Sequence, residues 1–109
     1  MHAVTNAEAP LEEAWRRFDA AVARSDWPSA RSVAHEAAAA AAGARDGLEK
    51  LSVTPTLAAA RREELLFVNH AFLAFQDFAA RGATGVDLAK LKSILRRGRI
   101  HQARGRATL

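Results

Sequence analysis

The stretch LLFVNHAFLAFQDFAA, residues 65–80, decides how this chain of 109 residues folds. Its apolar residues recur three and four positions apart, which predicts a helix rather than a strand. One apolar stripe comprises Leu65, Val68, Phe72, Phe75 and Ala79, and a second comprises Phe67, Ala71, Ala74 and Phe78. Two stripes on one helix are typical of a central helix that contacts two neighbours in a bundle.

Capping signals set the ends of this third helix. Thr54 precedes Pro55, a pairing that suits an N-cap followed by a first turn. Gly82 stands where a helix commonly closes. We therefore expect a helix from Pro55 or Thr56 to Ala80 or Arg81.

Two helices are expected before it. The first runs from about Pro10 to Arg24, because a proline fits the first turn and an apolar stripe follows, made of Leu11, Trp15, Phe18 and Val22. Ser25 or Asp26 caps the second, which runs from about Pro28 to Lys50 or Leu51. Its run of alanines at 37–42 lets a neighbouring helix approach closely.

The C-terminal part is expected to be less regular. Thr84 or Asp87 caps a short fourth helix that ends near Arg97. Beyond Gly98 the chain is arginine, glycine and small residues, which offer little to bury. The prediction is an all-α fold, an antiparallel helical bundle of three long helices plus a short fourth helix over residues 1–97. A basic, flexible tail follows at 98–109.

Positive charge is concentrated at this end. The whole chain carries a net charge of +4, yet no acidic residue follows Lys90. The basic residues there are Lys90, Lys92, Arg96, Arg97, Arg99, Arg104 and Arg106. They are candidates for contact with nucleic-acid phosphates or with an acidic protein, or else form a solvated extension that aids solubility or rests against the acidic body. No aromatic residue accompanies them, so stacking on bases is not expected.

The third helix supplies a second candidate surface. Its two stripes are explained by a central position in the core, but the first two helices offer mostly alanine to cover them. The alternative is that one stripe is left over as a patch for a partner helix or a second copy of the chain. The residues of that candidate patch are Phe67, Leu73, Phe75 and Phe78.

Catalysis is not expected. The chain has no cysteine, so it has no disulfide, thiolate metal site or cysteine nucleophile. His35 and Glu36 are adjacent and point in different directions, whereas His70 and Asp77 are two helical turns apart. We expect no enzyme activity, no metal and no cofactor. With no basic and apolar leader, and no apolar run of ~20 residues, a cytoplasmic location is expected.

The stretch from Leu11 to Ala80 resembles the FliT-type flagellar export chaperones. The matching features are Ser25-Asp26-Trp27 at the first turn, Glu36 in the second helix and the link Thr54-Pro55. Asp26-Trp27 followed by Ala30 equally resembles one tetratricopeptide hairpin. The chaperone resemblance implies a small helical protein that holds a substrate on an apolar helical surface.

These observations lead to two functional hypotheses. The first is a protein-binding adaptor or chaperone that contacts a partner, or dimerises, through the apolar face of the third helix. The alternative is a nucleic-acid-associated protein that binds phosphate through its basic C-terminal region.

Overall fold

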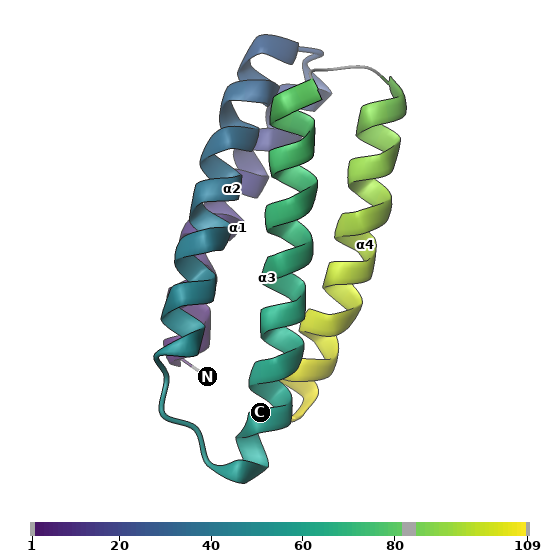
Figure 1. Ribbon diagram of the computed structural model, residues 1–109. Coiled ribbons are helices and arrows are strands. Elements are labelled where there is room, and N and C mark those ends of the chain that lie inside the picture. Colours follow the sequence, from purple (N-terminus) through teal and green to yellow (C-terminus); the bar gives the residue numbers. More distant parts are fainter. Residues whose placement is uncertain (1, 82–84, 109) are drawn as a thin grey trace.

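The computed structural model describes residues 2–81 and 85–108, and they form four helices (Figure 1). These are α1 (His2–Ala23), α2 (Trp27–Glu49), α3 (Pro55–Arg81) and α4 (Gly85–Thr108). They lie side by side in an elongated body of about 44 × 20 × 20 Å. The expected all-α fold is confirmed. Over the part of the chain that the structure describes, none of these helices is apolar along enough of its length to serve as a membrane span.

The turn between α1 and α2 is held by local hydrogen bonds. Ser25 has a φ of 54°, and the amides of Ser25 and Asp26 donate back to the carbonyls of Val22 and Ala21, both at 2.9 Å. This is the Schellman arrangement, with serine in the left-handed position where glycine is usual. The Asp26 carboxylate then accepts from the Ser29 amide at 3.2 Å, so the predicted cap of α2 is confirmed.

The predicted start of α3 is also confirmed. The Thr54 hydroxyl accepts from the Leu57 amide at 3.4 Å, and the helix begins at Pro55. It ends at Arg81, within the expected range. The predicted closing glycine, Gly82, and one of the predicted caps of the fourth helix, Thr84, lie outside the described residues.

The predicted start of the first helix is wrong. α1 begins at His2, eight residues before the expected position, and Pro10 lies inside it. Proline removes one backbone donor from a helix interior and is costly there. Two side chains of the additional turns are buried, however, Val4 with 7 % exposure and Glu8 with none. Tertiary contacts therefore hold the helix together on both sides of the proline.

The predicted end of the fourth helix is wrong as well. α4 has 24 residues and continues through Gly98 and Gly105 to Thr108, so residues 98–108 are not a separate tail. Both glycines are buried against α3. A Cβ atom on Gly105 would lie 2.9 Å from the Ala60 carbonyl oxygen, and one on Gly98 would lie 3.1 Å from the Cβ of His70. These glycines act as small packing residues that let two backbones approach, rather than as helix breakers.

Aromatic rings fill the core between α1 and α3, whereas α2 contributes mostly small side chains. Trp15 stacks on Phe67 with ring centroids 6.1 Å apart, and Phe18 meets Phe75 and Phe78 edge to face at 5.3 and 5.1 Å. The buried part of α2 is mostly alanine: Ala30, Ala34, Ala37, Ala38, Ala41 and Ala44. Because alanine lets α2 lie close, the large rings of α1 and α3 meet one another across the bundle.

Candidate functional site

The patch predicted on α3 is largely part of the monomer core. Phe67 and Phe75 have no exposed surface, and Phe78 is 1 % exposed. A partner cannot reach these rings while the bundle is closed, so the prediction of an exposed patch is wrong for them. Helix α1 covers these phenylalanines through Trp15 and Phe18. Leu73 is the exception, with 59 % of its surface exposed.

The seven basic residues lie on α4 and divide between two faces of it. Lys90, Arg97 and Arg104 are spaced seven apart and share one face. The other four share the face that is turned toward α1: Lys92, Arg96, Arg99 and Arg106. The helix thus places on different faces basic residues that are close together in the sequence.

The second of these faces meets acidic residues of α1. Arg106 lies 2.8 Å from the Glu8 carboxylate, and Arg99 lies 2.7 Å from Glu12. The Gln102 amide also donates to Glu8 at 3.1 Å. These contacts close the seam between α1 and α4 near the beginning of α1. They fulfil, for Arg99 and Arg106, the predicted alternative of a basic segment that rests against the acidic body.

Arg99 lies where the ion-paired part of the seam ends and the groove begins. Its guanidinium carbon lies 3.9 Å from the centre of the Trp15 ring, within cation–π distance. Lys90, on the other face of α4, pairs with Asp77 of α3 at 3.3 Å. At least three of the seven basic residues therefore have acidic partners within the chain.

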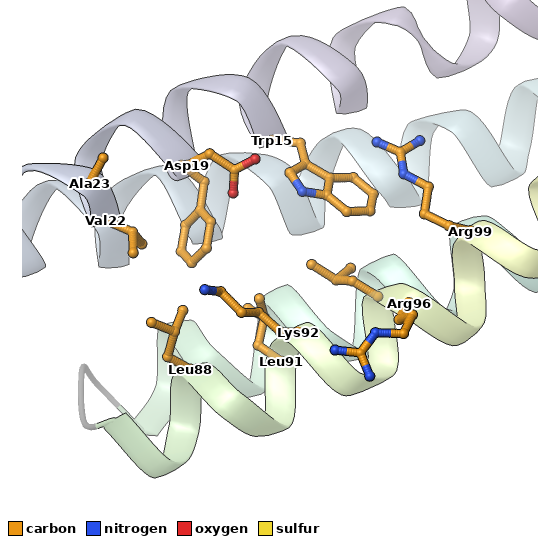
Figure 2. A pocket seen from close by; sticks show the side chains of 11 residues that line it. Trp15, Asp19, Val22, Ala23, Leu88, Leu91, Lys92, Arg96 and Arg99 are labelled. Carbon is orange, nitrogen blue, oxygen red and sulfur yellow. The ribbon is translucent and has the colours of Figure 1, made fainter.

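Beyond Trp15 the seam opens into a groove of about 540 Å³ (Figure 2). The two walls come from α1 and α4, whose side chains face one another across it. Most of the lining is apolar: Trp15, Phe18, Val22, Ala23, Leu88, Leu91 and Leu95. The polar lining residues are Asp19, Lys92, Arg96 and Arg99.

The charges of the groove are unevenly distributed. Among the described residues, neither Lys92 nor Arg96 has an acidic group within ion-pair distance. Asp19 is the acidic residue of the α1 wall. Burial raises the pKa of the Asp19 carboxyl, and the charges of Lys92 and Arg99 oppose that rise from across the groove. The groove thus has a cationic α4 wall and a weakly anionic α1 wall.

A pair of buried carboxyl groups lies at the closed end of the seam. Glu8 and Glu64 have no exposed surface, and Arg106 lies 3.5 Å from a Glu64 oxygen as well as bonding Glu8. Burial, together with the neighbouring Glu8, raises the pKa of Glu64 to about 8. The Glu64 carboxyl therefore keeps its proton to a higher pH than an ordinary glutamate.

A histidine cluster lies on the side where α4 meets α3. His101 lies 2.6 Å from the Glu63 carboxylate, and its ring centre is 5.4 Å from that of His70. His70 in turn donates to the Leu66 carbonyl at 2.7 Å. None of these residues lines the groove, and the described residues contain no group of three or more metal-ligating side chains placed to hold an ion.

The sequence carries no local signal for the groove, but it does carry one for the contact between α1 and α4. Acids at 8, 12 and 19 on α1 have counterparts of opposite charge at 106, 99 and 92 on α4, in reverse order. Such complementary spacing suggests two helices that run alongside each other. This pairing requires residues 98–108 to be helical, because Arg99 and Arg106 otherwise have no fixed position relative to α1.

Comparison with protein families, with curated proteins and with solved structures finds no match. The resemblance to the FliT-type export chaperones stays a prediction.

Proposed function

We propose that this protein is a binding module of the adaptor type, which holds an apolar segment of a partner protein in the groove between α1 and α4. The observation that carries the proposal is the incomplete closure of the seam. Ion pairs hold α1 to α4 at one end, and an apolar groove separates them at the other.

The arrangement of the two helices supports this reading. The pairs Glu8–Arg106 and Glu12–Arg99 fit neighbouring helices of opposite direction in an antiparallel bundle. In such a bundle the first and last helices lie side by side although no loop joins them directly. A segment that enters between these two helices would complete the bundle by packing against existing apolar walls.

The composition of the groove supports a binding role as well. Its volume of about 540 Å³ is in the range of ~300–1,000 Å³ that ligand sites usually have. Tryptophan and arginine are enriched where binding energy is concentrated, and here Trp15 and Arg99 lie at the closed end of the groove. Burial of leucine side chains against this lining would supply the main favourable free energy of binding.

Trp15 provides a direct test. The chain has two tryptophans and no tyrosine, so the variant Trp27→Phe leaves Trp15 as the only strong fluorophore. We expect a synthetic amphipathic peptide with a leucine-rich face to shift the Trp15 emission and to show saturable binding. A peptide of the same composition in scrambled order is the control for unspecific adsorption.

Matched variants locate the binding surface. Leu88→Glu places a charge in the groove and should weaken peptide binding at least about tenfold, which is about 1.4 kcal/mol. Leu73→Glu places the same charge on the exposed face of α3 and should leave binding unchanged. Circular dichroism checks that both variants remain helical. Equal binding by the two variants would contradict the proposal.

Binding of nucleic acid remains a prediction, and its dependence on salt concentration distinguishes it from peptide binding in the groove. Phosphate binding through α4 would fall steeply between low and moderate ionic strength. Apolar binding in the groove would change little. A titration of duplex DNA at two salt concentrations, with the peptide titrated in parallel, distinguishes these two functions.

A further inference from the structure

We infer that the segment held by the groove is an amphipathic α-helix whose acidic side faces Lys92 and Arg96. This inference rests on the proposed function and specifies the chemistry of the partner. It follows from three features of the groove: the type of its walls, the position of its charges and its length.

The type of wall favours a helix over an extended peptide. α1 and α4 satisfy their interior backbone hydrogen bonds within themselves, so neither wall offers a row of free N–H or C=O groups. An extended peptide would leave its own backbone groups without partners against the apolar floor, which is costly. A helix carries its backbone hydrogen bonds with it and presents only side chains.

The position of the charges specifies the partner's acidic side. Lys92 and Arg96 are four residues apart on one wall, a separation of about 6 Å along a helix. Two carboxylates spaced four apart on a docked helix would match them. Asp19 on the opposite wall would repel the same carboxylates. The charge pattern therefore selects one rotational setting of the helix in the groove.

No acid within the described chain already fills this role. Asp19 interacts electrostatically with Lys92 across the groove without an ion pair between them, and Glu12 is bonded to Arg99 at the end of the groove. Figure 2 shows the Lys92 side chain extending from α4 into the space between the two helices, near Leu88 and Leu91, and the Arg96 side chain beside α4. The α4 wall of the groove thus carries two cations, Lys92 and Arg96, beside an apolar lining of leucines, which suits an acidic amphipathic helix.

The length of the groove limits the size of the bound segment. Its lining runs along α1 from Trp15 to Ala23 and along α4 from Leu88 to Arg99. At 1.5 Å per residue these distances are about 12 and 16 Å. A docked helix would therefore contact the groove over two to three turns, with apolar anchors at positions i, i+3 or i+4 and i+7.

Three synthetic peptides test the inference on the Trp27→Phe protein, with Trp15 emission as the readout. The first has a leucine face flanked on one side by two glutamates spaced four apart. The second has lysines in place of those glutamates. The third has the first peptide's sequence with a central proline, which prevents a continuous helix.

We expect the acidic peptide to bind at least about tenfold more tightly than the lysine peptide. The double variant Lys92→Glu/Arg96→Glu should reverse that preference. Arg97→Glu is the matched control, because Arg97 is adjacent to Arg96 but does not line the groove. It should preserve the preference for the acidic peptide. The proline peptide should bind more weakly than its parent.

The outcomes separate this inference from the proposed function. Equal binding of the acidic and lysine peptides would overturn the charge assignment and leave the groove as an apolar binding site. If the proline peptide bound as tightly as its parent, the helical assignment would be overturned. If no leucine-rich peptide alters Trp15 emission, the proposed function and the inference fail together.

Discussion

The Arg106 guanidinium at the end of α4 lies 2.8 Å from the Glu8 carboxylate at the beginning of α1, although the two residues are 98 positions apart in the chain. Glu8 is buried, whereas Arg106 reaches it from a half-exposed position. This pair makes the last turns of α4 part of the bundle. The stability of the fold should therefore depend on a residue that the sequence places in a tail.

Replacement of Arg106 by methionine should destabilise the protein. The substitution leaves Glu8 as a buried charge without its cation, a change that typically costs about 3–5 kcal/mol. Urea unfolding followed by circular dichroism measures the loss. Arg97→Met on the exposed face of the same helix is the control and should change the free energy of unfolding by less than about 0.5 kcal/mol. Glu8→Gln in the Arg106→Met background should recover part of the loss.

The protonation of Glu64 should make stability depend on pH. Its pKa is raised from 4.5 to about 8 in the folded protein. Between these values the unfolded chain releases a proton that the folded protein retains, so this group's contribution to stability is complete below pH 4.5 and is lost as pH rises to 8. The loss should amount to a few kcal/mol, since one pKa unit corresponds to about 1.4 kcal/mol.

Glu64→Gln isolates this effect, because glutamine resembles the protonated acid and does not titrate. Urea unfolding of both proteins at several pH values between about 5 and 9, which span the raised pKa of Glu64, gives the difference between them. The variant should gain in stability relative to the parent as pH rises. A difference that stays constant over this range would show that Glu64 does not retain its proton in the fold.

Replacement by alanine should change the stability of the protein in opposite directions at Gly43 of α2 and at Gly105 of α4. A Cβ atom at Gly43 would meet nothing within 4 Å, so Gly43→Ala should stabilise α2 by about 1 kcal/mol through helix propensity. At Gly105 the added methyl group would meet the Ala60 carbonyl at 2.9 Å. Gly105→Ala should therefore destabilise the protein by about 1–3 kcal/mol despite the better propensity. Thermal unfolding of both variants would reveal whether the two effects differ in sign.

Phe75 and Leu73 should differ sharply although both are apolar residues of α3. Phe75→Ala leaves a cavity beside Trp15 and Phe18 and should cost about 3–5 kcal/mol. Leu73→Ala removes an exposed side chain and should cost less than about 0.5 kcal/mol. Urea unfolding compares them. A small loss for Phe75→Ala would mean that its ring is not part of the core.

The sequence was sufficient to predict the elements that local chemistry determines. Asp26 and Thr54 cap α2 and α3 as expected, because each side chain bonds a backbone amide only three residues away. The two stripes of α3 likewise predicted a helix with two neighbours. These features depend on spacing within a few turns and need no knowledge of distant residues.

The α1 start, the α4 end and the groove depend on contacts between distant residues. Pro10 is a favourable first-turn residue, so it concealed eight helical residues that precede it. Glycine predicts a helix end at 98 and 105 when local propensity alone is considered, whereas its small size is what α3 requires there. The inward positions of α4 continue the spacing of four and three through both glycines: Leu91, Leu95, Gly98, Gln102 and Gly105.

The ion pairs between α1 and α4 lie at one end of these helices, which has a geometric consequence for the other end. Leu88, in the groove, is seventeen residues from Gly105, a distance of about 25 Å along the helix. Rotation of α4 by about 5° around the Gly105 contact would displace Leu88 by about 2 Å. A small tilt at Gly105, opposed by the contacts of Lys90, Leu91 and Gly98 with the rest of the bundle, would therefore change the width of the groove at its far end.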